Sequence, residues 1–241
     1  MPLALELAKR ITALRYENLP PEAVHWAKVG ILDTIGVTLA GSNDPCATIV
    51  AGVLSCPGPS LLLCTSKRTT PLDAALVNGA ASHALDFDDC NNTMAGHPSA
   101  PVLSALFALA DEIGASGRDF ITAYVAGFET ECKISLGVNL YQYTRGWHPT
   151  GTLGVFGSAA ACAKLLKLDE QRTATALSIA ASLSSGIKSN FGTYVKPLHV
   201  GHAARNGLFA ALIARDDYTA SAVAFEHKQG YFEVFNGAGN Y

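Results

Sequence analysis

The sequence is poor in charge. Only 15% of its 241 residues are Asp, Glu, Lys or Arg, where an ordinary soluble domain has roughly 25%. Hydrophobic residues make up 49%, which excludes a disordered chain. With 17 Lys and Arg against 20 Asp and Glu, the chain lacks the basic excess that binds phosphate backbones, so we expect no nucleic-acid partner. The low charge indicates helices buried on most sides, or a large subunit interface.

Long apolar runs and targeting signals are missing as well. A membrane-spanning helix needs about 20 consecutive apolar residues, and the sequence contains no such stretch. The first ten residues include Glu6, Lys9 and Arg10, so they lack the apolar region of a signal peptide. We therefore expect no membrane association and a cytoplasmic location. None of the six cysteines forms a C-x-x-C pair, which predicts reduced thiols in the core rather than zinc or disulfides.

The hydrophobic pattern is helical nearly throughout, and no regular alternation of strands with helices occurs. This predicts an all-α fold in which glycines and alanines inside the helices allow close packing. A strand is expected at 60–64 only. The expected helices run from the Pro20-Pro21 pair to Gly41 and over 46–54, 71–85, 98–113, 119–136, 149–167, 170–184 and 197–214.

Three dipeptides share one pattern: His97-Pro98, His148-Pro149 and Lys196-Pro197 each open a predicted helix. A residue before proline favours extended geometry, and proline suits the first helical position. The three side chains are thus expected beside helix N-termini, where unpaired N–H groups attract anions. Together they would suit a carboxylate or phosphate ligand, although any one of them can also be ordinary helix punctuation.

Three acidic residues lie within Asp86-Phe87-Asp88-Asp89, at the end of a predicted helix. Negative charge is unfavourable there unless cationic or hydrogen-bonding groups offset it. An aspartate of this cluster could act as a general base or orient a substrate, with His97 or His148 as general acid. Alternatively, Asp88 and Asp89 could belong to a solvated loop or cap neighbouring helices.

Recognised metal and nucleotide motifs are absent. The sequence has no H-E-x-x-H, P-loop, G-x-S-x-G or dinucleotide fingerprint, and the Asp cluster lacks D-D-x-x-D spacing. We therefore expect no metal site. The remaining histidines are expected to pack or cap helices: His25, His83, His199, His202 and His227.

Several motifs, in order along the chain, resemble the MmgE/PrpD family, whose members include 2-methylcitrate dehydratase, cis-aconitate decarboxylase and iminodisuccinate epimerase. These motifs are Ile31-Leu32-Asp33-Thr34-Ile35-Gly36-Val37, the Asp86–Asp89 cluster with His97-Pro98-Ser99, Gly146-Trp147-His148-Pro149-Thr150-Gly151-Thr152-Leu153-Gly154, Gly157-Ser158-Ala159-Ala160-Ala161, and Lys196-Pro197-Leu198-His199-Val200-Gly201-His202-Ala203-Ala204-Arg205-Asn206-Gly207. The resemblance covers essentially the whole chain.

The resemblance implies a large helical domain plus a smaller α/β lid, a homodimer, and no metal or organic cofactor. Residues 1–241 correspond to the helical domain in its N-terminal part, and we expect the lid to be absent. The implied catalytic residues are Asp86, His97, His148 and Lys196. The implied substrate-binding residues are Cys90, where the family often has threonine, Thr150 and Lys196.

The chemistry implied is proton transfer beside a carboxylate of a small di- or tricarboxylic acid, as in a dehydratase or decarboxylase acting on 2-methylcitrate or cis-aconitate. Two alternatives stay open. The chain could be an epimerase of a dicarboxylate such as iminodisuccinate, or an inactive dimerisation or carboxylate-binding module. The catalytic hypotheses share one geometric prediction, namely that Asp86, His97, His148 and Lys196 gather around a common hollow.

Overall fold

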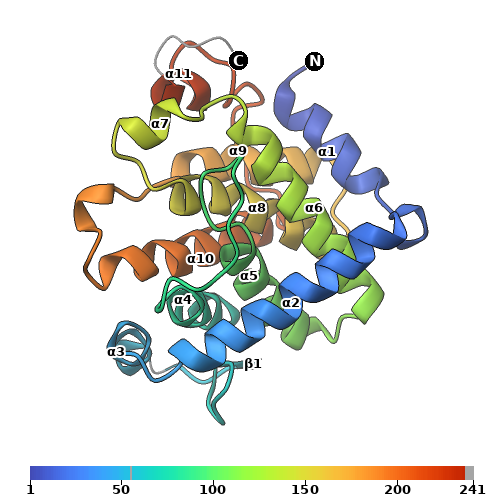
Figure 1. Cartoon of the computed structure of the whole chain (residues 1–241). Helices are drawn as coiled ribbons and strands as arrows, with labels where there is room; N and C mark the ends of the chain where they lie inside the picture. Colours follow the sequence, from blue (N-terminus) through green and yellow to red (C-terminus); the bar gives the residue numbers. More distant parts are fainter. Residues whose placement is uncertain (55, 237–241) are drawn as a thin grey trace.

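The computed structural model describes residues 1–54 and 56–236, and its regular structure is almost entirely helical (Figure 1). This confirms the all-α prediction, and residues 237–241 of the predicted 1–241 domain lie outside the described part. The helices are α1 Leu3–Ala13, α2 Pro21–Gly41, α3 Pro45–Val53, α4 Pro71–Ser82, α5 Ser99–Ile113, α6 Gly117–Ser135, α7 Tyr141–Thr144, α8 Pro149–Leu165, α9 Glu170–Leu183, α10 Val195–Arg215 and α11 Tyr231–Asn236, with short 3-10 helices at Tyr16–Asn18 and Lys188–Asn190.

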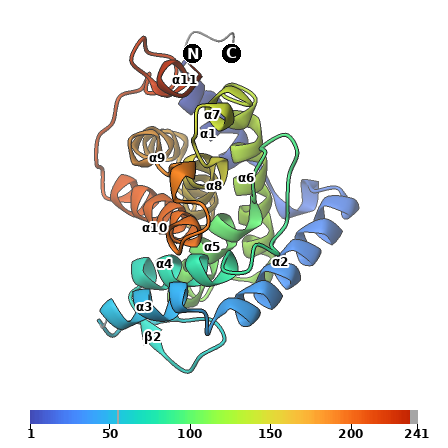
Figure 2. The same ribbon diagram turned by 60° about the vertical axis from the view of Figure 1, so that its left-hand side comes forward.

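Helix α8 forms the centre of the molecule. All of its residues except Lys164 are buried, and helices α5, α6, α9 and α10 pack around it (Figures 1 and 2). Its side chains are mostly Gly, Ala, Ser and Thr, so neighbouring backbones approach closely. A Cβ at Gly157 would lie 2.7 Å from Val102 of α5 and from Glu131 of α6. The small residues inside the helices thus pack as the sequence predicts.

Local signals at several helix ends are confirmed. Thr70 caps α4, because its hydroxyl accepts a hydrogen bond from the Asp73 N–H at 3.2 Å, and Pro71 occupies the first helical position. This helix ends at Ser82, three residues before the predicted end. Helix α8 begins at Pro149 with His148 as its extended N-cap residue, as expected.

Three expectations need correction. The predicted strand over 60–64 is only Ser60–Leu61 (β1), which pairs antiparallel with an unexpected β2, Arg68–Thr69. Helix α1 was not predicted. It buries Ala4, Ala8 and Ile11, which lie on one apolar face at helical spacing. The cysteines are all free, but only Cys46 and Cys162 are buried and Cys132 is partly buried, while Cys56, Cys64 and Cys90 are exposed.

The described residues include no helix that is both long and apolar enough to cross a membrane.

The contact between α4 and α10 positions the residues considered below. Gly79 of α4 faces Gly201 of α10 so closely that a Cβ at Gly79 would lie 2.5 Å from the Gly201 Cα. A Cβ at Gly201 would lie 2.1 Å from the Leu76 carbonyl oxygen. Since real Cβ atoms do not approach backbone so closely, only glycine at both positions allows this packing.

We expect Gly201→Ala to lower the free energy of unfolding by about 1–3 kcal/mol, because the two backbones must separate. Urea unfolding followed by circular dichroism measures the change. Gly52→Ala in α3 is the matched control, since a Cβ there meets nothing within 4 Å. The control should be neutral or stabilising by up to about 1 kcal/mol. Equal stability of the two variants would contradict the close-packing argument.

Candidate active site

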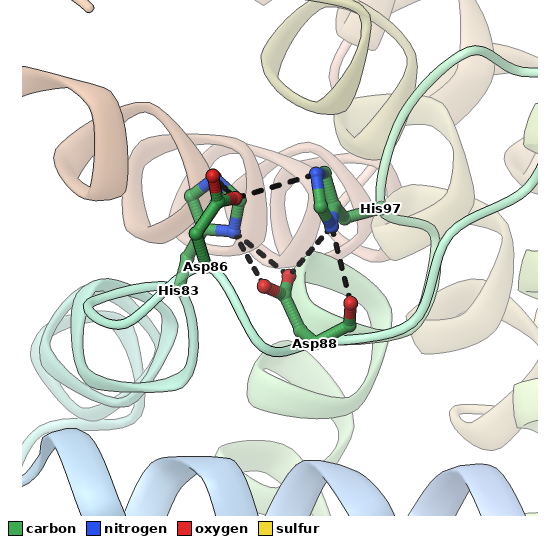
Figure 3. A group of neighbouring side chains, drawn as sticks. All are labelled: His83, Asp86, Asp88 and His97. Atoms are coloured by element: carbon green, nitrogen blue, oxygen red, sulfur yellow. Dashed lines mark hydrogen bonds and ion pairs between the residues drawn. The ribbon is translucent and has the colours of Figure 1, made fainter. Parts of the chain in front are cut away.

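Three segments meet at one cluster of polar side chains. The loop between α4 and α5 carries His83, Asp86, Asp88 and His97 (Figure 3), His148 lies at the start of α8, and Lys196 lies in the first turn of α10. The distances below show that these groups lie next to one another. Four of them, Asp86, His97, His148 and Lys196, are the residues predicted as catalytic.

Asp86 is the carboxylate at which the cationic group and two imidazoles converge. Its Oδ1 accepts a hydrogen bond from Lys196 Nζ at 2.5 Å and lies 3.5 Å from His97 Nε2 and 3.8 Å from His83 Nε2. Burial raises the pKa of this carboxyl, but the hydrogen bond and charge of Lys196 outweigh it and leave the pKa of Asp86 below its usual value. The group is therefore an anion at neutral pH. Its backbone φ is 58°, a left-handed conformation that aspartate tolerates better than most residues.

Asp88 lies on the opposite side of the two rings and is buried. Its two carboxylate oxygens each lie 2.8 Å from His83 Nδ1. Its Oδ2 is 3.5 Å from His97 Nδ1, and its backbone oxygen is 3.3 Å from the same nitrogen. The rings of His83 and His97 meet edge to face with their centres 4.7 Å apart. Asp88 is thus an anchor for histidines, not part of a solvated loop.

Asp89 supports the start of α5 instead. It accepts hydrogen bonds from the Ser99 N–H at 3.1 Å and from the Ser99 hydroxyl at 2.5 Å, and this hydroxyl also contacts Tyr124 OH at 2.5 Å. Burial raises the pKa of Asp89 above its usual value, although the bonds from Ser99 act in the opposite direction. The helix-capping alternative considered for this residue is correct.

His97 is held from both its backbone and its ring. Its backbone N–H donates to the Thr150 hydroxyl at 3.1 Å, and Cys90 Sγ lies 3.7 Å from its Nδ1. Thr150 is fully buried, so in this structure it supports His97. Cys90 is exposed beside the ring. Contact of Cys90 or Thr150 with a substrate stays a prediction.

His148 is buried at the N-terminus of α8. Its Nδ1 lies 3.2 Å from His199 Nδ1, its ring centre is 4.9 Å from that of Phe191, and it is 5.7 Å from that of His83. Burial, followed by the charges of His83 and His199, lowers the pKa of His148 to about 2. The free ring is therefore neutral at physiological pH.

Lys196 does not occupy the position that its proline suggested. Helix α10 begins at Val195 with Tyr194 as its cap residue, so Lys196 is already inside the helix and is not an extended cap. The ammonium still lies at the N-terminal end, 5.4 Å from the Phe191 ring centre. Its side chain is 16% exposed, which leaves it accessible to a small anion.

Sequence reasoning missed His83 and His199, which were expected to pack or cap. His83 precedes Asp86 by three residues, and His199 follows Lys196 by three. On a helix a spacing of three places side chains on one face. For His199 and Lys196, both within α10, that spacing is the signal that could have found the residue.

The loop between α4 and α5 also brings together residue types that bind metal ions. His83, Asp86, Asp88 and His97 offer ligand atoms that all lie within 4.8 Å of one another. However, Asp88 is engaged by His83, and the Lys196 ammonium already bonds Asp86 Oδ1. A divalent cation would have to displace this ammonium, so the arrangement suits acid–base chemistry and carboxylate binding better than metal binding.

The chain is similar in sequence to one known protein family and to several of its members. The MmgE/PrpD N-terminal domain matches residues 5–241. A cis-aconitate decarboxylase-like protein of Aspergillus oryzae is 32% identical over 249 residues, covering 98% of this chain and 51% of that protein. Human cis-aconitate decarboxylase is 32% identical over 216 residues, covering 86% and 45%. The Aspergillus terreus enzyme is 30% identical over 247 residues, covering 98% and 50%. The chain thus spans about half the length of these relatives.

We expect the free energy of unfolding to fall as the pH drops below 6.5. His148 in the unfolded chain takes up a proton near 6.5, but in the folded protein it does so only near pH 2. The unfolded state therefore binds more protons in this window, which removes up to about 1.4 kcal/mol per pH unit for this group. His199 and His202, whose pKa values burial also lowers, act in the same direction.

His148→Gln should reduce this slope, as measured by urea unfolding from about pH 7.5 to about pH 5. The slope should fall more in His148→Gln than in His227→Gln, which removes an exposed histidine. An unchanged slope in His148→Gln would contradict the lowered pKa of the buried ring.

Proposed function

Because the chain belongs to the MmgE/PrpD family, through its N-terminal domain, we propose that it carries the acid–base groups of a lyase that decarboxylates a small tricarboxylic acid, with cis-aconitate as substrate. The observation that carries the proposal is the convergence of Lys196, Asp86 and the imidazoles from three distant segments. The cis-aconitate decarboxylases among the relatives support the choice of reaction over dehydration or epimerisation.

Anion binding is the first requirement of this reaction. Lys196 has three N–H donors, and the contact with Asp86 uses one of them. The remaining donors can bind a substrate carboxylate. The N-termini of α8 and α10 add favourable electrostatics for negative charge, since their first N–H groups have no partner within the helix. A substrate with several carboxylates can therefore be held at more than one point.

In the decarboxylation, one proton takes the place of the carboxylate that leaves the substrate. The bond between the substrate carbon and the departing carboxylate breaks, and carbon dioxide leaves. The electron pair stays on the substrate, delocalised over the neighbouring double bond and its carboxylate. A proton from an acid group then adds to carbon, so the products are carbon dioxide and a five-carbon unsaturated diacid. The protein has to hold the carboxylates and supply this proton.

The two imidazoles are suited to different tasks. His148 is neutral, since its pKa lies near 2, so it can orient a substrate by hydrogen bonding but is a poor base and carries no acidic proton at neutral pH. His97 is partly exposed and lies between the carboxylates of Asp86 and Asp88. We assign the proton-donating role to His97 and the orienting role to His148.

We expect the purified chain to convert cis-aconitate, with product followed by proton NMR and released carbon dioxide measured in parallel. His97→Gln and Lys196→Ala should each reduce turnover by about 10²–10⁴-fold, the usual contribution of a general acid–base group or charged anchor. His227→Gln is the matched control, because this imidazole is exposed and its ring accepts a hydrogen bond from Gln229 in its own loop.

Full activity of His97→Gln would remove its proposed role. Calorimetric binding of cis-aconitate without any product would overturn the enzyme proposal in favour of a carboxylate-binding module. The absence of both binding and turnover would overturn the enzyme proposal as well.

We also propose a second copy of this chain as its partner. Helix α2 exposes a row of large apolar side chains, among them Trp26, Leu32 and Leu39 at 60%, 72% and 59% exposure. An exposed apolar face of this kind is typical of a subunit interface. Light scattering after size exclusion should give twice the mass of the chain, and Leu32→Glu should halve it. A monomer at all concentrations would contradict the proposal.

A further inference from the structure

The carboxylate of Asp88 lies between two imidazoles and is fully buried, as is the His83 side chain. In Figure 3 dashed lines join Asp88 to Nδ1 of both rings and Asp86 to Nε2 of His97. The proposed reaction does not use Asp88 or His83 directly. A buried charge that contacts no substrate calls for another role, since burying it is unfavourable unless its hydrogen bonds compensate.

The hydrogen bonds determine where the ring protons lie. An ionised carboxylate only accepts hydrogen bonds. Because both oxygens of Asp88 lie 2.8 Å from His83 Nδ1, this nitrogen carries the proton. His97 Nδ1 lies 3.3 Å from the Asp88 backbone oxygen and 3.5 Å from Asp88 Oδ2, which both accept hydrogen bonds. These two contacts favour a proton on Nδ1 of His97 over the alternative in which the Cys90 thiol, at 3.7 Å, donates to that nitrogen. In a neutral ring the other nitrogen, Nε2, then has a free lone pair.

Both Nε2 atoms point toward the same oxygen. His97 Nε2 lies 3.5 Å and His83 Nε2 3.8 Å from Asp86 Oδ1. Within the described residues, His83 Nε2 is buried without a hydrogen-bond partner. Two lone pairs next to an anionic oxygen repel one another unless positive charge is present, and the Lys196 ammonium on Asp86 Oδ1 supplies it.

We propose that Asp88 is a positioning residue that holds His83 and His97 in the same Nδ1–H tautomer, so that two basic Nε2 atoms and the Asp86 carboxylate face one place. A proton arriving there is shared among three acceptors, and the imidazole of His97 can take it up between turnovers. The tautomers follow from the geometry alone, whereas their effect on turnover rests on the proposed function.

The tautomers can be measured directly in the unmodified chain. Two-bond proton–nitrogen correlation spectra of the histidine rings distinguish a protonated from an unprotonated nitrogen. Signals are assigned by their loss in His83→Gln and His97→Gln. At about pH 8, above the usual imidazole pKa, we expect Nδ1 protonated and Nε2 unprotonated in both rings. A proton on Nε2 of His83, in either the neutral or the doubly protonated form, would overturn the proposal.

Asp88→Asn then tests the cause. The amide replaces one acceptor oxygen by a donor that faces His83 Nδ1, so the His83 ring should change at least partly to the Nε2–H form. Asp89→Asn is the matched control, because this neighbouring carboxylate is partly buried and is also hydrogen bonded, but to Ser99. The control should destabilise the protein and leave both tautomers unchanged. Identical spectra of Asp88→Asn and the unmodified chain would overturn the role of Asp88.

The kinetic consequence separates this proposal from the proposed function. If the chain decarboxylates cis-aconitate, Asp88→Asn should lower kcat by about 10²-fold or more with KM changed less than about threefold, the pattern of a group that acts in the transition state. Equal losses of kcat in Asp88→Asn and Asp89→Asn would overturn the positioning role. If the unmodified chain is inactive while the tautomers are as expected, the proposed function fails and the arrangement around Asp88 stands.

Discussion

The backbone contact between α4 and α10 is the constraint on which the site depends. Gly79 and Gly201 let the two helices approach at atomic contact, and this brings the end of α4 beside the beginning of α10. Asp86 follows the first helix, Lys196 lies in the first turn of the second, and their side chains meet at 2.5 Å. A wider separation of the helices would leave a carboxylate and an ammonium facing water independently, without the shared geometry that acid–base chemistry requires.

Charge in the site is arranged in layers around the imidazoles. Asp88 lies behind the rings and is shielded from water, while Asp86 and Lys196 lie in front of them and are partly exposed. His148 is buried and uncharged, because burial and the neighbouring charges of His83, His199 and Lys196 all lower its pKa. The exposed part of the cluster therefore holds the groups that can exchange protons and bind anions, and the buried part fixes their orientation.

Much of the fold and part of the site follow from sequence patterns. Helical periodicity and the caps at Thr70 and His148 predict their helices because these signals are local. The role of His83 could not be predicted in this way, since its partner Asp88 acts through a loop geometry that periodicity does not describe. Lys196 shows the opposite case: its proline suggested an extended cap, but the turn before it starts the helix two residues earlier. Convergence of groups over a hundred residues apart depends on packing, which no local pattern encodes.

Asp86 and Lys196 are 110 positions apart, and the glycine of α10 that lets them meet comes still later in the chain. During synthesis the loop that carries Asp86 leaves the ribosome long before Lys196, whose ammonium offsets the charge of Asp86. Domains fold as units once enough of the chain has emerged. A nascent chain that ends before α10 therefore has the anionic half of the site without its counter-charge. The contact between Asp86 and Lys196 can form only after α10 has been synthesised and has docked against α4.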